Sequence, residues 1–172
     1  MVSDCDGKRI YDTAPMHPPP YSHPDIATYS NLLAESFRRW TGQALVTGNN
    51  IAAALYEAPF PLVSHGTEAD PVFRYANRAA LTLWETDWIS FTRMPSRLSA
   101  EPIGVIQDDR QQLLRAAIQK GWVGDYRGIR ISARGRRFEI SDTILWNVVD
   151  AQGRLHGQAA RIGRVDYASG SL

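Results

Sequence analysis

The sequence predicts an α+β fold, with a five-stranded antiparallel sheet, helices on one face of it, and further N-terminal helices. Residues 60–76 hold two short strand patterns joined by a polar turn. Residues 122–162 hold three more strand patterns, joined by connections short enough for hairpins. Helical patterns separate the two groups. Because hairpin connections join antiparallel strands, the last three strands form a meander.

Length and composition describe one ordinary globular domain. The chain has 172 residues, of which 44% are hydrophobic and 22% are charged. Its net charge of +1 favours neither nucleic acid nor an anionic membrane as a partner. The start is polar and no apolar run is long enough to span a bilayer, so we expect a cytoplasmic protein. The single cysteine, Cys5, excludes an internal disulfide.

Residues 1–24 hold five of the ten prolines and are predicted to be a mobile tail. One domain is expected over residues 25–165, followed by a short C-terminal tail over residues 166–172. Ser22 and Asp25 have the spacing of a capping box that begins a helix.

The helix from Asp25 to Trp40 is expected to end at Gly42. Its apolar residues recur at helical spacing: Ile26, Tyr29, Leu32, Leu33, Phe37 and Trp40. Such a face either covers a sheet or pairs with another chain. It is wide for a helix that covers one sheet, so we expect it to support a homodimer.

A second short helix follows Asn49 or Asn50, either of which is able to cap it. Strands are expected over residues 61–66 and 71–76. Asn77 then has the place of an N-cap, whose side-chain oxygen accepts from backbone N–H groups two or three residues on.

A short helix over residues 87–93 and an irregular stretch over residues 95–102 precede the next long helix. Asp108 and Asp109 are expected to open that helix and Gly121 to close it, because acidic residues at the start complement the helix dipole.

Strands are expected over residues 122–132, 136–149 and 155–162. In the middle strand the even positions are apolar except for Asp142, and alternation predicts that they share one face. These positions are Phe138, Ile140, Ile144, Trp146 and Val148. Trp146 is therefore predicted to point from the sheet toward the helix that follows Asn77.

This order of elements is that of a PAS-like domain, and three stretches of sequence resemble the MEKHLA domain. They are Leu55-Tyr56-Glu57-Ala58-Pro59-Phe60 through Ser64-His65-Gly66-Thr67-Glu68, Thr92-Arg93-Met94-Pro95-Ser96-Arg97-Leu98-Ser99-Ala100, and Gly128-Ile129-Arg130-Ile131-Ser132 to Trp146-Asn147. The similarity covers roughly residues 25–162. The chain resembles the free-standing bacterial members; in plants the domain closes homeodomain–leucine-zipper transcription factors.

The resemblance implies a sensory or regulatory module without catalysis of its own. Such a module binds a small organic ligand, or acts as a protein-interaction module through a homodimer or a regulatory partner. The sequence shows no homeodomain, zipper or kinase pattern, so we expect any output to pass through another molecule. The runner-up is a small enzyme that uses the cavity between sheet and helices, with His65 and Glu101 as acid/base groups.

The candidate ligand-binding residues are Tyr75, Asn77, Trp84, Trp88, Arg93, Arg97 and Trp146. Aromatic side chains line pockets for organic ligands, but they also fill cores, and both alternatives stay open for the tryptophans. Arg93 and Arg97 are able to clamp a carboxylate or phosphate, or to fix their own loop with Glu101 as partner.

The cofactor is not identified by the sequence. A cysteinyl flavin adduct needs a cysteine on the central helical segment, whereas Cys5 is in the tail; non-covalent flavin stays open. Haem is disfavoured because no histidine lies between residues 87 and 121. No catalytic or metal site is predicted.

Five arginines cluster around one predicted hairpin: Arg127, Arg130, Arg134, Arg136 and Arg137. A contact with RNA or DNA is conceivable, but no stacking-aromatic motif accompanies the cluster. We expect a solvated strand face that guards against edge pairing, with nucleic acid an unlikely partner.

Overall fold

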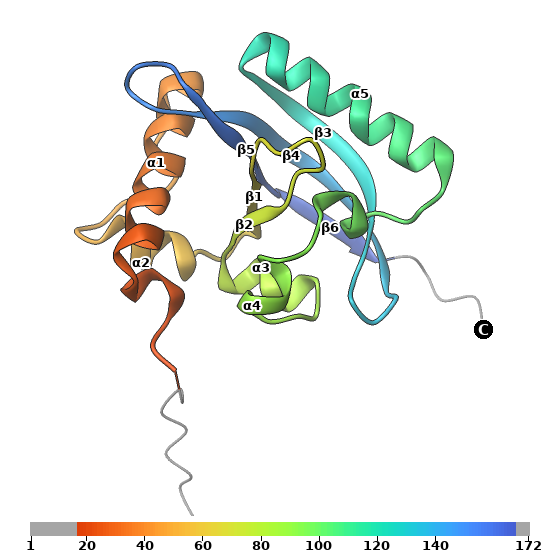
Figure 1. Ribbon diagram of the computed structural model, residues 1–172, viewed down its shortest axis with the longest axis horizontal. Helices are drawn as coiled ribbons and strands as arrows, with labels where there is room; N and C mark the ends of the chain where they lie inside the picture. Colours follow the sequence, from red (N-terminus) through yellow and green to blue (C-terminus); the bar gives the residue numbers. More distant parts are fainter. Residues whose placement is uncertain (1–16, 168–172) are drawn as a thin grey trace, which may run out of the picture.

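An antiparallel sheet runs through the centre of the computed structural model, which describes residues 17–167 (Figure 1). The strand order is β2-β1-β5-β4-β3. The five predicted strands are all present: β1 (Leu62–His65), β2 (Phe73–Ala76), β3 (Trp122–Ile131), β4 (Arg137–Val149) and β5 (Leu155–Arg161). The α+β fold class is therefore confirmed.

A sixth strand, β6 (Arg164–Tyr167), was not predicted. It pairs with the first half of β4, from Phe138 opposite Tyr167 to Ser141 opposite Arg164. The strand includes residues 166 and 167, which were expected to belong to a C-terminal tail; residues 168–172 lie outside the described residues.

Helices cover both faces of the sheet. On one face lie α1 (Pro24–Thr41) and α2 (Ile51–Tyr56). On the other lie α3 (Arg78–Leu83) and α5 (Gly104–Lys120), with α4 (Trp88–Phe91) and the 3-10 helix η2 (Ser96–Ser99) beside them. In Figure 1 α1 and α5 stand on either side of the sheet. Among residues 17–167, no helix combines the length and the apolar character that crossing a membrane requires.

The described part of the predicted tail contains a 3-10 helix, η1 (Pro20–Ser22), and the ring of Tyr21 lies 5.5 Å from that of Tyr56. The predicted capping box is wrong. Ser22 belongs to η1, and the cap of α1 is His23, whose Nδ1 accepts a hydrogen bond from the N–H of Asp25 (3.2 Å). Gly42, with φ of 72°, ends α1 as predicted.

The predicted start of α5 is also wrong. The helix begins at Gly104, one turn before Asp108, and its N-cap Ile103 makes no side-chain cap bond. The chain between Pro102 and Asp108 holds no residue that blocks a helix interior, so the helix extends back almost to the proline.

The alternation of side chains between the two faces of the sheet is interrupted in β4 at Asp142. Asp142 has φ of 48°, and β4 has one residue more than β3 between the pairs Tyr126–Thr143 and Gly128–Ile140. A bulge of this kind shifts the alternation by one residue. Phe138 and Ile140 therefore share their face with Leu145, toward α5.

Trp146 consequently lies on the opposite face from Phe138, and its predicted orientation toward α3 is wrong. It packs with Leu33 and Phe37 of α1, the ring of Phe37 standing edge-on at 4.9 Å. Its indole N–H donates to Ser36 Oγ (3.1 Å).

The wide apolar face of α1 packs on the sheet of its own chain. Leu33 and Phe37 are buried there, and the other four predicted residues are partly buried against the same cluster. Trp40 also donates its indole N–H to the carbonyl of Asn147 (2.8 Å). The observation from which we predicted a homodimer thus has a different explanation, since the sheet covers that face.

Asn77 caps α3 as predicted, and its side chain also binds backbone groups of two other segments. Its Oδ1 accepts from the N–H groups of Ala80 (3.1 Å) and Leu62 (2.9 Å). Its Nδ2 donates to the carbonyls of Phe60 (2.8 Å) and Leu55 (3.2 Å). One fully buried amide therefore joins the end of α2, the start of β1 and the start of α3.

We predict that Asn77→Ala lowers the free energy of unfolding by roughly 3–5 kcal/mol, because it leaves several buried backbone groups without partners. Asn50→Ala is the matched control. Asn50 caps α2 through a single bond to Ala53 at the surface, so its loss should cost about 1 kcal/mol. Urea unfolding of both variants measures the difference; equal losses would contradict the wider role of Asn77.

Trp146→Ala should cost about 3–5 kcal/mol, the usual loss for a large core residue. Because Trp146 lies on the α1 face, this variant should keep its response to any small molecule that binds on the α5 face. Thermal unfolding with and without such a compound checks this. If the variant still folds but the compound no longer raises its melting temperature, the two faces are not independent.

Candidate functional site

A cavity of about 50 Å³, which we call the inner cavity, lies between the sheet and α5. All five strands of the main path contribute to its wall, together with Trp84, η2 and α5. A space of this size holds about three water molecules.

An open cleft of about 430 Å³ adjoins the inner cavity. Both spaces are lined by the same five residues, which come from β1, η2, α5 and β5: His65, Ser96, Arg110, Leu114 and Gln158. These five residues form the neck between the inner cavity and the cleft. A group bound at the neck is therefore within reach of both spaces.

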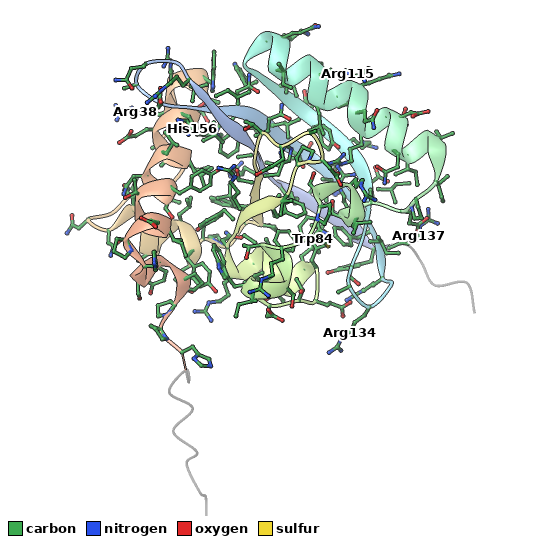
Figure 2. The ribbon with its side chains drawn as sticks, in the orientation of Figure 1. Arg38, Trp84, Arg115, Arg134, Arg137 and His156 are labelled. Carbon is green, nitrogen blue, oxygen red and sulfur yellow. The ribbon has the colours of Figure 1, made fainter. Side chains whose placement is uncertain are left out.

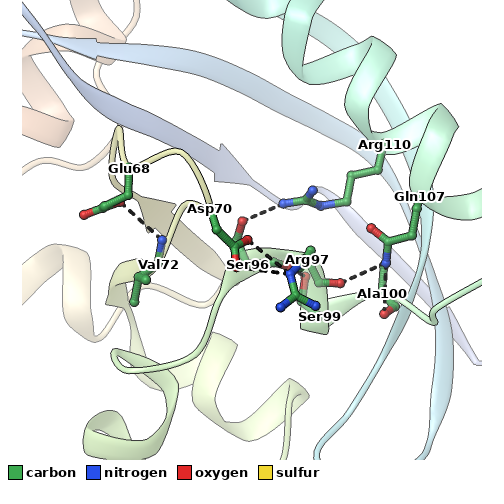
Figure 3. A network of polar contacts seen from close by, with 9 residues as sticks. All are labelled: Glu68, Asp70, Val72, Ser96, Arg97, Ser99, Ala100, Gln107 and Arg110. Carbon is green, nitrogen blue, oxygen red and sulfur yellow. Dashed lines mark hydrogen bonds and ion pairs between the residues drawn. The ribbon is translucent and has the colours of Figure 1, made fainter.

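Arg110 extends from α5 to the neck, where it donates to Ser96 Oγ of η2 (2.6 Å; Figure 3). Only 8% of the residue is exposed. Burial lowers the pKa of Arg110 to about 10, and the positive charge of Arg130 acts in the same direction. The guanidinium nevertheless stays protonated at neutral pH.

Arg130 reaches the inner cavity from β3 and is 7% exposed. It donates to the carbonyl of Ile129 (2.8 Å) and to the hydroxyl of Tyr126. Gly128 leaves room for it, since a Cβ there would lie 2.8 Å from Nη1 of Arg130. Within residues 17–167, neither Arg110 nor Arg130 has a carboxylate within 4.0 Å.

Two ring nitrogens of residues in the wall of the inner cavity have no hydrogen-bond partner among the described residues. They are Nε2 of His65 and Nε1 of Trp84. The Nδ1 of His65 lies 2.9 Å from the carbonyl of Gly66, which only accepts, so Nδ1 carries the proton. Burial lowers the pKa of His65, which makes the ring neutral and Nε2 a free acceptor. Trp84 Nε1–H is a free donor.

Of the seven predicted ligand-binding residues, Trp84 lines the inner cavity. It lies in the interior of the molecule in Figure 2. Tyr75, Trp88 and Trp146 pack on the α1 side, with the rings of Tyr75 and Trp88 edge-on at 5.6 Å. Asn77 is occupied by its backbone bonds.

The two arginines of the predicted clamp do not come together on one anion. Arg97 lines the cleft and pairs with Asp70 (3.2 Å), while Arg93 lines neither space. Glu101 is the partner of Arg137 (2.5 Å) rather than of these arginines. Figure 3 shows instead that Gln107 holds the end of η2, donating to the carbonyls of Arg97 and Ala100.

The acid/base pair of the enzyme alternative is not assembled. His65 lines the inner cavity and the cleft, whereas Glu101 lines neither. Residues 17–167 also contain no group of three or more His, Cys, Asp or Glu placed to hold a metal ion.

The arginine-rich hairpin divides into exposed residues and one buried residue. Arg127 pairs with Glu139 (3.3 Å), Arg136 lies 3.6 Å above the ring of Tyr167, and Arg134 points outward at the hairpin tip (Figure 2). Arg130 differs, because it points into the core. The expectation of one solvated arginine face is wrong for this residue.

The comparisons with known proteins agree with this architecture. The model of the MEKHLA domain family matches residues 27–167. The chain belongs to the MEKHLA domain family. Homeobox-leucine zipper protein HOX29 of Oryza sativa subsp. japonica is 24% identical over 140 residues, which are 76% of this chain and 16% of HOX29. The chain thus spans about a sixth of that relative.

Solved structures share the fold at low identity. The PAS domain of a protein from Colwellia psychrerythraea is similar with a TM-score of 0.57 at 12% identity, over 65% of this chain and 91% of that one. An RNA-binding light-oxygen-voltage receptor gives 0.53 at 19%, over 65% of this chain and 31% of the receptor. This MEKHLA domain therefore has a PAS-like fold.

The lowered pKa of His65 gives a pH dependence with a definite sign. In the unfolded chain His65 protonates near pH 6.5, whereas the folded protein holds it neutral to lower pH. Unfolding then takes up a proton, so stability falls as the pH drops below 6.5. His65→Gln should make this fall less steep. Urea unfolding between pH 8 and pH 5 measures it, and an unchanged slope would contradict the neutral, buried ring.

Proposed function

We propose that this MEKHLA domain is a cytoplasmic sensory or regulatory module that responds to a small organic molecule held in the inner cavity and the adjoining cleft. The observation that carries the proposal is the wall of that cavity. Buried polar groups normally have hydrogen-bond partners, and leaving one without a partner costs about 1–3 kcal/mol. Among residues 17–167, His65 Nε2 and Trp84 Nε1 have no such partner, and both belong to residues of the same cavity wall.

The position of the inner cavity supports a role in signalling. Its neck joins β1, β5, η2 and α5, which come from distant parts of the sequence. A ligand at the neck changes the forces on α5, because Arg110 of α5 is one of the neck residues. Ligands that bind one conformation better than another shift the population toward it. No group assembled at the cavity calls for a catalytic role in this scheme.

The output of the module is proposed to be contact with a protein partner. The homodimer stays a prediction. The apolar face of α1 no longer supports it, because that face packs on the sheet of its own chain. The exposed apolar residues on α5 and at its ends, Val105 and Ile118 among them, leave the outer side of that helix accessible in this chain.

Thermal shift with the full chain tests the proposal. The compounds are flavins, nucleotides, indoles and organic acids, and native mass spectrometry of the purified protein reports any ligand that copurifies. We expect at least one class to raise the melting temperature of the wild type. Ala160→Leu, which fills the inner cavity, should abolish that rise.

Trp146→Phe is the matched control, because it alters the core on the opposite face of the same sheet and should keep the response. A small molecule that copurifies with the wild type but not with Ala160→Leu would support the proposal equally. No stabilisation by any compound, together with no copurified molecule, would overturn it and leave a protein-interaction module.

A further inference from the structure

The inner cavity holds two buried cations whose negative partner is absent from the described part of the chain. Arg110 and Arg130 both line it, and each is less than a tenth exposed. The arginines that do form ion pairs within residues 17–167 lie nearer the surface, as Arg97 does with Asp70. Burying a cation without a counter-charge is unfavourable, so Arg110 and Arg130 lower the free energy of unfolding of the ligand-free protein.

The carboxylates that lie in the surroundings do not compensate the pair, and Glu68 in the cleft is bonded to Arg74. Asp70 stabilises the charge of Arg110 from a distance, but it is hydrogen-bonded to Arg97. Asp109 and Glu139 line a further hollow that Arg110 and Arg130 also line, but neither carboxylate forms an ion pair with them, and Glu139 pairs with Arg127. The repulsion between Arg110 and Arg130 is therefore not neutralised by a direct ion pair.

The remaining polar groups of the wall define the rest of the ligand. Within the described part of the chain, His65 Nε2 is an acceptor without a donor, and Trp84 Nε1–H is a donor without an acceptor. The apolar part of the wall includes Phe73, Ile140 and Leu145. A matching molecule has an anionic group, an apolar body and a hydroxyl or N–H.

We propose that the inner cavity and its neck are a carboxylate site for a small organic acid that also carries a hydroxyl or N–H group. Arg110 and Arg130 bind the carboxylate, and His65 Nε2 accepts from the hydroxyl or N–H. The cavity alone accommodates only a few heavy atoms, so the remainder of a larger acid extends past the neck into the cleft. This inference rests on the proposed function and names the ligand class for the same site.

The test compares acids with their neutral amides on the full chain. The three pairs are 4-hydroxybenzoate and 4-hydroxybenzamide, indole-3-acetate and indole-3-acetamide, and lactate and lactamide, measured by thermal shift and titration calorimetry. We expect an acid to stabilise the protein and its amide to do so at least about tenfold more weakly in Kd, because charge-assisted bonds to the arginines are lost. Benzoate should bind more weakly than 4-hydroxybenzoate, and His65→Phe should remove this difference.

Two variants separate a ligand role from a structural one. Arg110→Met should abolish the stabilisation by acids while keeping or raising the melting temperature of the free protein, because it removes an uncompensated buried charge. A structural Arg110 would instead make the free protein less stable. Arg134→Met is the matched control: its exposed side chain at the hairpin tip lines neither space, and it should bind acids like the wild type.

The outcomes also separate this inference from the proposed function. A neutral compound that stabilises the wild type at least as strongly as the acids do, but does not stabilise Ala160→Leu, would overturn the carboxylate site and leave the sensory module standing. Stabilisation by inorganic phosphate but by none of the three acids would likewise overturn it. No stabilisation by any compound overturns both, and binding of an acid equally well by Arg110→Met overturns the assigned role of the arginines.

Discussion

The bulge of β4 at Asp142 is the constraint on which both halves of the structure depend. One strand supplies Phe138, Ile140 and Leu145 to the α5 face and Trp146 to the α1 face, and only a shift of the alternation permits this. The bulge also demands a glycine opposite it. A Cβ at position 163 would collide with the carbonyl oxygen of Asp142, so β5 and β6 are able to follow β4 through the bulge only with glycine there.

The two faces formed in this way differ in quality of packing. On the α1 face, large apolar side chains fill the space and the indole N–H of Trp146 has its partner in Ser36; the Tyr75 hydroxyl is the buried side-chain atom on this face that lacks a partner among residues 17–167. On the α5 face, two ring nitrogens lack partners and two guanidinium groups lack carboxylates among residues 17–167. Close packing is the rule for protein interiors, and departures from it that gather in one place are typical of binding sites rather than of the scaffold.

Local signals in the sequence predicted several helix ends, although Ser22 and Asp108 did not mark the starts of α1 and α5. Three helices begin after a residue whose side chain accepts a hydrogen bond from a free backbone N–H: Asn50, Asn77 and Asp87. Helix α1 ends at Gly42, because glycine adopts the left-handed conformation there without strain. The face of Trp146 was mispredicted, because alternation assumes an uninterrupted strand and the polar Asp142 in an apolar series was the sign of the interruption. The family resemblance was confirmed over the same region that carries the fold.

The cavity itself was not predictable from local patterns, since its wall comes from elements far apart in the sequence. One residue did carry a signal. Arg110 precedes Leu113, Leu114 and Ala117 at helical spacing, so it occupies a place on the apolar stripe of its helix where a leucine would be expected. Arg130 stands between Ile129 and Ile131 in β3. Either Arg130 or the two isoleucines face inward, and the irregular pairing of β3 with β4 decides which, so the sequence alone carried no signal here.

The attachment of α5 explains why the contents of the cavity matter to the rest of the fold. This helix buries only Arg110 and Ala117, whereas α1 buries Leu33 and Phe37 against the sheet. Two polar side chains of the sheet also hold α5: Gln158 donates to the carbonyl of Leu114 (3.0 Å), and Asn147 donates to that of Ile118 (3.2 Å). Elements with little buried apolar surface open at the lowest free energy. Because Arg110 of α5 is a wall residue, and Gln158 at the same neck is bonded to α5, a change of charge in the cavity acts directly on this helix.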